Sequence, residues 1–303
     1  MKRSSFLWAF VLPFLSVSVL STSSYARTWL VRQDGSGDCT TVQSCIDAAE
    51  PGDTVLVGPG VYAEDIHIFG KTNLVLAGES GPATTTLQAQ APSSTAIMVN
   101  NCTGDIVIER LAIAHSYSIM GSGGIDCVNS TLAVRDNVIF DCHSAGIEGQ
   151  DGAGGGIGVW GGSGVIIERN SIWKCGVGLG GNGGGILASD VSNLTIRDNI
   201  VAGCTGGGGI YAYSCPNILV LCNDVWNNMP FNYTGTMADQ TGLNGNISVD
   251  PMFCDAASWN LLLHSDSPCL NAPGCGRIGA LGAGCGPTAV QESSWGKIKT
   301  LFR

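Results

Sequence analysis

Three aromatic residues and one aspartate follow glycine-rich stretches in the middle of the chain: Trp160, Tyr211, Tyr213 and Asp126. Each stretch ends in Gly-Ile, and the next residues alternate as they do in a β-strand, where every second side chain shares a face. If each Ile points inward, Trp160 and Tyr213 belong to one exposed column, with Tyr211 and Asp126 in the column beside it. Aromatic rings on a flat sheet can stack on sugar rings, so the pattern predicts a carbohydrate-binding face. The alternative is that loops cover these rings as a small satellite core.

Acidic residues form a second candidate group, which consists of Glu148, Asp151 and Asp190 together with Asp126. Two carboxylates about 5–9.5 Å apart could serve as acid and base on a glycosidic bond, and a cluster of carboxylates could hold Ca²⁺. Their spacing in the sequence does not establish that they converge, and acidic loop residues usually face water. We therefore predict no resident metal and no cofactor.

These side chains are carried on an internal repeat. Four of its segments share an Asn, and in the first a Leu stands at the same place, with steps of 26, 33, 29 and 24 residues between equivalent positions. Apolar residues alternate before that position, which is the period of a strand with one buried face. The segments are IVIERLAI (106–113), LAVRDNVI (132–139), VIIERNSI (165–172), LTIRDNIV (194–201) and ILVLCNDV (218–225).

The Gly-Ile element recurs in register with this repeat, ending at Ile125, Ile157, Ile186 and Ile210. Short strands joined by glycine-rich turns, with no amphipathic helical period, fit coils that stack equivalent positions about 4.8 Å apart. The predicted fold is all-β, a right-handed parallel β-helix with a short N-terminal cap helix and a C-terminal closing module.

Charged residues occupy equivalent positions in successive coils. Successive coils carry Glu109, Arg135, Glu168 and Arg197 in one column and Arg110, Asp136, Arg169 and Asp198 in the next, so the sign alternates along both. We predict a ladder of ion pairs on the outer wall, each exposed pair contributing about 0–1 kcal/mol. The alternative is that these arginines act as lyase bases or anion clamps.

The shared Asn and a cysteine column complete the scaffold. The Asn side chains are predicted to bond the next coil at a turn that tolerates positive φ. Cys142, Cys175 and Cys204 each lie five residues after their Asn, and we expect them to be small buried hydrophobes rather than a bridge between coils.

The remaining cysteines and the N-terminus indicate export. Lys2 and Arg3 precede an apolar run from Phe6 to Leu20, which predicts a signal peptide over residues 1–26 with cleavage after Ala26. The 13 cysteines then lie in the mature chain, where an odd count leaves at least one unpaired. We predict bridges between Cys39 and Cys45 and between Cys275 and Cys285.

Composition excludes several function classes. The chain has 303 residues with 44 Gly and only 13% charged residues, and its net charge is −10. Binding to nucleic acid requires a basic footprint, which this balance does not supply. No segment of the mature chain is long and apolar enough to span a bilayer, so we expect an exported monomer, either secreted, on the cell surface or periplasmic.

Two further stretches resemble a known family. PGDTVLVGPGVYAE (51–64), preceded by TVQSCIDAA (41–49), resembles the opening of secreted right-handed parallel β-helix proteins of the pectin-lyase-like superfamily. Residues 246–285, with NISVDPMFC (246–254), SDSPC (265–269) and IGALG (278–282), resemble the closing module of bacterial secreted β-helix repeat proteins. The resemblance implies an N-terminal cap over 27–50, coils over 51–245 and a closing module over 246–285. The residues that follow, 286–303, form a separate tail with Trp295, Ile298 and Leu301 on a possible helical face. We expect this tail to cap the last coil, and the alternative is a short sorting or docking tail.

The catalytic signatures of the relatives are missing. The chain lacks the Asn-Thr-Asp and Gly-His-Gly motifs of polygalacturonase-type hydrolases and the Asp-His and Arg-x-Pro-x-x-Arg patterns of pectate lyases. The leading hypothesis is an exported, carbohydrate-associated protein with no recognisable catalytic site. The alternatives are a polysaccharide lyase or glycoside hydrolase that uses divergent acidic residues, and a purely structural or adhesive surface protein.

Overall fold

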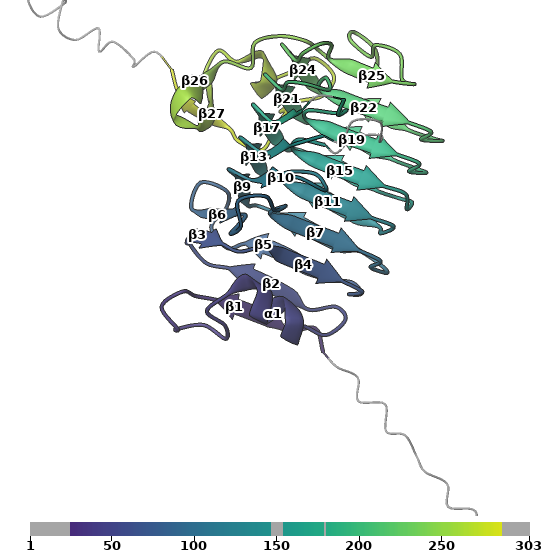
Figure 1. The fold of residues 1–303 in the computed structure, drawn as a ribbon. Coiled ribbons are helices and arrows are strands. Elements are labelled where there is room, and N and C mark those ends of the chain that lie inside the picture. The colour runs from purple at the N-terminus through teal and green to yellow at the C-terminus, as the bar shows by residue number, and fades with distance from the viewer. Residues whose placement is uncertain (1–24, 147–153, 179, 287–303) are drawn as a thin grey trace, which may run out of the picture.

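The computed structural model describes residues 25–146, 154–178 and 180–286. Over these residues the chain winds into stacked coils whose strands run parallel in three long sheets (Figure 1). The predicted signal peptide and most of the predicted tail lie outside the described residues and stay predictions. The predicted parallel β-helix is confirmed.

The three long sheets are named here A, B and C. In spatial order, sheet A consists of β1 (Thr28–Val31), β2 (Thr54–Val57), β5 (Val75–Gly78), β8 (Ile106–Glu109), β12 (Leu132–Arg135), β16 (Ile166–Glu168), β20 (Thr195–Arg197) and β23 (Leu219–Leu221). Sheet B consists of β3 (Gly60–Ala63), β6 (Thr85–Gln88), β9 (Ala112–Ala114), β13 (Val138–Phe140), β17 (Ser171–Trp173), β21 (Ile200–Ala202) and β24 (Asp224–Trp226). Sheet C consists of β4 (Ile66–Phe69), β7 (Ile97–Asn100), β11 (Ile125–Val128), β15 (Ile157–Trp160), β19 (Ile186–Ser189), β22 (Ile210–Tyr213) and β25 (Tyr233–Gly235).

Two smaller sheets complete the strands. Sheet D lies between sheets B and C along the chain and consists of β10 (Tyr117–Ser118), β14 (His143–Ser144) and β18 (Gly176–Val177). Sheet E belongs to the closing module and consists of β26 (Phe253–Asp255), β27 (Asn260–His264) and β28 (Ala283–Cys285).

The register of the coils agrees with the sequence repeat. Ile125 pairs with Ile157, Ile157 with Ile186 and Ile186 with Ile210, so the Gly-Ile elements stack in sheet C. These four side chains are fully buried and point into one apolar core shared by the coils. Because side chains alternate along a strand, the residues one and three places later face outward.

A ladder of buried asparagines links the coils at the turn between sheets A and B. Except in the last Asn, each side-chain amide donates to the side-chain oxygen of the Asn in the next coil and to backbone carbonyls. The same oxygen also accepts the backbone N–H of the donating Asn at 2.9–3.0 Å. The ladder consists of Asn137, Asn170, Asn199, Asn223 and Asn246. The left-handed backbone lies one residue earlier than expected, at Asp136, Arg169 and Asp198, which leaves each Asn free to turn inward.

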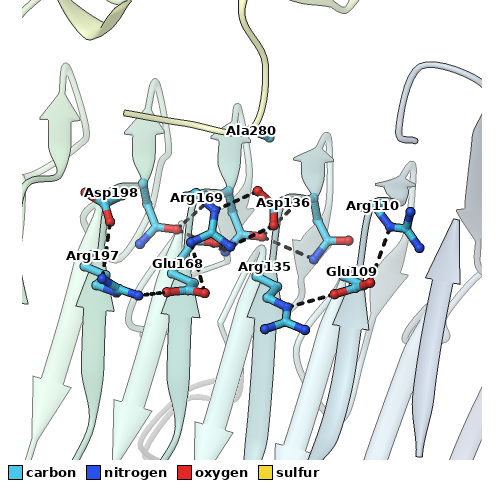
Figure 2. A network of polar contacts seen from close by, with 12 residues as sticks. Glu109, Arg110, Arg135, Asp136, Glu168, Arg169, Arg197, Asp198 and Ala280 are labelled. Carbon is cyan, nitrogen blue, oxygen red and sulfur yellow. Dashed lines mark hydrogen bonds and ion pairs between the residues drawn. The ribbon is translucent and has the colours of Figure 1, made fainter. Parts of the chain in front are cut away.

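The predicted ion-pair ladder is confirmed on sheet A and the adjoining turn (Figure 2). Opposite charges meet both between neighbouring coils and within a coil. The pairs between coils join Arg135 Nε to Glu109 Oε2 at 2.8 Å, Arg169 Nε to Asp136 Oδ1 at 2.8 Å, and Arg197 to Glu168. The pairs within a coil join Arg110 to Glu109 at 3.3 Å and Arg169 to Glu168 at 3.1 Å. These arginines therefore serve the scaffold.

The N-terminal end is closed by α1 (Val42–Ala48), the predicted cap helix. Thr41 caps the helix by accepting the N–H of Ser44, and the carboxylate of Glu64 accepts the N–H groups of Val42 and Gln43. Val42, Cys45 and Ile46 are buried against the first coil, so the helix covers the open end of the core (Figure 1).

The closing module lies along the side of the solenoid rather than across its end. Besides sheet E it contains two 3₁₀ turns, η1 (Ala256–Ser258) and η2 (Pro268–Leu270). Leu261 packs on the outward face of β9 and β13, and Ile278 packs on that of β21. The hydrogen bonds that join the module to the coils include those from Gly279 N–H to the carbonyl of Asp198 at 2.7 Å and from Ala280 N–H to Ser171 Oγ at 3.0 Å.

Three disulfides occur within the described residues. Cys39–Cys45 is present as predicted. The predicted Cys275–Cys285 bridge is wrong: Cys275 pairs with Cys222 and Cys285 pairs with Cys254. The two cysteines are close in sequence, but the module folds back so that each meets a partner 53 or 31 residues away.

The cysteine column behaves as a set of small hydrophobic side chains. Cys142, Cys175 and Cys204 are buried and unbridged. Burial raises the pKa of the Cys204 thiol to about 12, so this thiol stays protonated at neutral pH. Within the described part of the chain no helix has the length and apolar character needed to cross a membrane.

Candidate functional site

The outward face of sheet C presents the predicted aromatic column. Val128, Trp160, Ser189 and Tyr213 occupy equivalent places on successive strands. Tyr213 is 43% exposed, and Trp160 is half-buried. Trp160 and Tyr213 are two strands apart, which corresponds to about 10 Å along the solenoid axis. The structure thus brings the two main predicted binding residues onto one face.

The column extends further toward the N-terminus than the sequence indicated. Phe69 lies in the same register as Trp160, three strands earlier, and is 49% exposed. Its ring stacks on that of His67 with the centroids 5.1 Å apart. β4 lacks the Gly-Ile element, so the repeat did not include it. The alternation of exposed and buried residues in its sequence, IHIF, is the signal that could have identified Phe69.

Asp126 fixes the edge of the Trp160 ring. Its Oδ1 accepts the indole N–H at 3.3 Å, the backbone N–H of Ser122 at 3.1 Å and the Ser122 hydroxyl at 2.9 Å. Burial raises the pKa of Asp126, and these hydrogen bonds only partly oppose the rise. Since the residue is 6% exposed, Asp126 supports the indole from beneath instead of meeting solvent.

The column beside Trp160 is covered. Asp126, Gly158, Leu187 and Tyr211 share this register, and Tyr211 is only 8% exposed. The glycine-rich segments that precede the strands fold close over their first residues. A Cβ on Gly183, for example, would approach the carbonyl oxygen of Ile186 to 2.4 Å and the Cα of Leu187 to 2.8 Å. Asp126 and Tyr211 face outward as predicted but are not part of the open surface.

The two described members of the acidic group do not form a pair. Asp190 lies two strands and three residues from Asp126 by register, a backbone separation of about 14 Å. Asp190 is exposed at the turn after β19, where it accepts a hydrogen bond from Ser189. Glu148 and Asp151 lie outside the described residues, so their part in such a group stays a prediction. Among the described residues no three His, Cys, Asp or Glu side chains are grouped to hold a metal ion.

A polar rim borders the aromatic column on the side of sheet A. The turn after each sheet C strand places one residue in the left-handed region, with φ of 50° at Asn101, 49° at Asn129 and 57° at Asp190. All three are exposed, so hydrogen-bonding groups lie beside the rings. Rings and a parallel row of amide and carboxylate groups form a strip suited to an extended ligand with apolar faces and polar edges.

A solenoid of stacked coils with parallel strands is the fold of β-helix proteins. A family model described as "Right handed beta helix region" matches residues 74–249, and the chain belongs to this family. The fold is accordingly a right-handed parallel β-helix. A search of curated proteins finds no significant match.

Two solved structures are distantly similar to this chain. One is a pectin methylesterase from carrot, with 12% identity over 76% of this chain and 91% of that chain and a TM-score of 0.33. The other is a pectin methylesterase mutant in complex with a hexasaccharide, with 10% identity over 79% of this chain and 96% of that chain and a TM-score of 0.25.

Proposed function

We propose that this protein is exported and binds a polysaccharide along the exposed strip of sheet C, without cleaving it. The observation that carries the proposal is the indole of Trp160, held at its edge by buried Asp126 and followed two strands later by exposed Tyr213. Rings fixed on a rigid sheet lose little conformational entropy when a ligand stacks on them, which favours binding.

The geometry of the strip supports an extended chain as the ligand. Phe69, Trp160 and Tyr213 are spaced by about 14 Å and about 10 Å along the solenoid axis, so a polymer that touches all three lies parallel to that axis. Asn101, Asn129 and Asp190 can exchange hydrogen bonds with its hydroxyl groups. The proposal assigns no reaction to this face, because Asp126 is buried and lies far from Asp190.

Export is supported by the three disulfides. Disulfides persist in secreted and periplasmic proteins and are rare in reducing compartments. Their presence in the described chain supports the expectation drawn from the N-terminal sequence.

The test is affinity electrophoresis of the full chain in gels that contain one polysaccharide each, neutral or acidic, with product release assayed in parallel. We expect Trp160→Ala and Tyr213→Ala each to weaken binding about tenfold, the loss typical of an aromatic anchor. Tyr117→Ala is the matched control, because Tyr117 is exposed on sheet D, away from the strip.

Three outcomes would contradict the proposal. Equal losses in the control and in the two strip variants would remove the strip from the binding surface. Release of reducing or unsaturated ends would replace the binding function by an enzymatic one. A chain that binds no polysaccharide in the panel would leave a structural or adhesive role.

A further inference from the structure

We propose that a second surface, on the turns between sheets B and D, binds oxyanions such as sulfate once its two histidines are protonated. It consists of His115, Asp141, His143 and Lys174 and is called here the histidine cluster. It lies on different strands from the sheet C strip, so it does not rest on the function proposed above.

The coils place three of these residues at one stacked position. His115, Asp141 and Lys174 follow β9, β13 and β17, and all three have left-handed backbone, with φ of 52°, 52° and 51°. Backbone hydrogen bonds join these turns to the adjoining coils, from His115 N–H to the carbonyl of Phe140 and from Asp141 N–H to that of Trp173. Equivalent positions in adjacent coils are about 4.8 Å apart, so the three side chains start close together.

Asp141 holds both imidazoles. Its Oδ2 lies 2.7 Å from His115 Nδ1, and its Oδ1 lies 3.1 Å from His143 Nε2. Burial acts to raise the pKa of Asp141, but hydrogen bonds from the two imidazoles outweigh it and lower the pKa. An ionised carboxylate only accepts hydrogen bonds, so each neutral imidazole places its proton on the nitrogen that faces Asp141.

In each neutral imidazole the other ring nitrogen, His115 Nε2 or His143 Nδ1, is therefore a hydrogen-bond acceptor until the ring is protonated. When both imidazoles are protonated, His115 Nε2 and His143 Nδ1 become N–H donors, and the charge of the cluster rises by two. With the ionised Asp141 balanced by Lys174, the cluster changes from neutral to doubly positive. The neutral cluster does not attract anions, whereas the doubly positive cluster does.

The missing side chain of Gly176 lets two possible donors come close together beside the backbone. Gly176 is the next residue in the register of sheet D after His143. A Cβ on Gly176 would lie only 3.0 Å from His143 Nδ1 and 2.7 Å from Thr205 Oγ1, so a larger residue does not fit there. The imidazole nitrogen and the hydroxyl thus lie near one another on neighbouring coils, and we expect both to donate to the same oxyanion.

Lys174 supplies the permanent positive charge. It is exposed and forms no ion pair among the described residues, and its Nζ lies 5.6 Å and 6.0 Å from the ring centroids of Trp173 and Trp259. The arginines of sheet A, in contrast, are paired with carboxylates. An anion that reaches Lys174 displaces no carboxylate among the described residues.

The surroundings of the imidazoles fix which groups can influence them. Among the described residues, the titratable neighbours are Asp141, Lys174 and Tyr117, whose strand pairs with that of His143. From sheet B, the ring of Phe140 lies edge-on to His115 at 5.1 Å, and from the closing module Trp259 does so at 5.5 Å. Both aromatic contacts are uncharged, so the pH dependence belongs to the cluster itself.

Sulfate is the appropriate probe, because its charge stays constant over the pH range of the experiment. We expect the full chain to bind sodium sulfate at least tenfold more tightly at about pH 5.5 than at about pH 7.5, measured by calorimetry and by the shifts of the histidine C2–H resonances. A sulfated monosaccharide, compared with its unsulfated parent and with sulfate alone, shows whether the oxyanion is recognised free or on a sugar.

Three variants test the assignment. His143→Gln and Lys174→Gln should each weaken sulfate binding at pH 5.5 about fivefold or more, and His143→Gln should also flatten the pH dependence. Gly176→Ala should weaken sulfate binding, because the added Cβ would displace the His143 imidazole and the Thr205 hydroxyl. The matched control is His264→Gln, since His264 also lies beside a carboxylate, Asp266, but in the closing module.

Sulfate affinity that is the same at both pH values would overturn the proposal. So would absence of binding at pH 5.5, or losses in His264→Gln as large as those in His143→Gln. Trp160→Ala should bind sulfate as the parent chain does, so failure of the sheet C proposal and failure of this one remain separate results.

Discussion

Asp224 is a buried carboxylate at the place where β24 meets the closing module. Its Oδ1 accepts the N–H of Val249 at 3.0 Å, and its Oδ2 accepts the thiol of Cys269 at 3.2 Å. Burial raises the pKa of Asp224 to about 6, and these hydrogen bonds only partly oppose the rise. A carboxyl with a raised pKa holds a proton in the folded chain that the unfolded chain has already lost, so it links stability to pH.

The direction of the pH dependence follows from the difference in the pKa of Asp224 between the folded and the unfolded chain. Below about pH 4 Asp224 is protonated in both states and adds no pH dependence, and between about pH 4 and 6 each rise in pH favours the unfolded chain. By this group alone, the free energy of unfolding should fall by on the order of 3 kcal/mol across that window. We expect Asp224→Asn to remove this fall, measured as the difference between the two pH profiles of chemical unfolding.

The control for Asp224 is a carboxyl that stays in water. Asp105→Asn changes an exposed carboxyl in an earlier coil and should leave the profile of the parent chain intact. If Asp224→Asn and the parent show parallel profiles from pH 4 to 7, the proposed linkage is wrong.

Among the elements, the closing module continues the ladder of the coils only as far as Asn246 and Ile247. Beyond these residues it is attached through side-chain packing, separate hydrogen bonds and the Cys222–Cys275 disulfide. Leu261 is 1% exposed and packs with Val138 and Phe140 on the outer face of sheet B. The ring of Trp259 stacks on Phe140 at 4.9 Å. Because these contacts lie outside the coil core, the module and the coils should open separately.

Leu261→Ala tests that separation. Removal of a buried leucine side chain costs about 2–5 kcal/mol, and here the loss should fall on the module. We expect faster hydrogen exchange over residues 253–264 with little change in β8, β12 and β16 of sheet A.

Leu262→Ala is the paired control, since the neighbouring side chain is only half-buried and should have a smaller effect. Equal acceleration of exchange in sheet A would show that the module and the coils form a single cooperative unit.

On the scale of the whole molecule, one disulfide lies at the N-terminal end of the solenoid, one joins the last coil to the closing module, and one lies within that module. Cys39–Cys45 tethers the N-terminal cap helix, whereas Cys222–Cys275 and Cys254–Cys285 anchor the last coil and the closing module. The described central coils hold together through backbone ladders, the apolar core and the asparagine ladder. In a solenoid each coil contacts mainly its neighbours, so stability is distributed along the axis.

Reduction of the protein should therefore loosen its ends first. A disulfide contributes about 2–4 kcal/mol by restricting the unfolded chain, and none of that contribution falls on the central coils. After treatment with a reductant we expect proteolysis to begin in the closing module while residues 106–213 remain protected, as followed by mass spectrometry.

The double variant Cys222→Ser/Cys275→Ser should reproduce the opening of the C-terminal end without a reductant. Cys142→Ser, at an unbridged buried thiol, should not reproduce that pattern. Reduction that exposes every coil at once would contradict the distributed stability.

Much of the architecture followed from the sequence because its causes are local and repeated. The alternation of apolar residues, the Gly-Ile elements and the shared Asn recur in every central coil, so aligning them also aligns the strands. The register of Trp160 with Tyr213 and the ion pairs between Glu109 and Arg135 follow from that alignment alone. Phe69 was missed because its strand lacks the recurrent glycine.

Other features depend on where segments outside the repeat come to lie. Tyr211 and Asp126 are buried, although alternation had placed both on the outer face. The closing module folds back along sheet B, and this return path gives Cys275 and Cys285 partners other than each other. Periodicity fixes the direction of a side chain relative to its own strand, and so the sequence alone determined the coils, their register and the aromatic column. The path of the non-repeating chain through space decides what covers a side chain and which distant residue it meets. Only the tertiary structure determined that path.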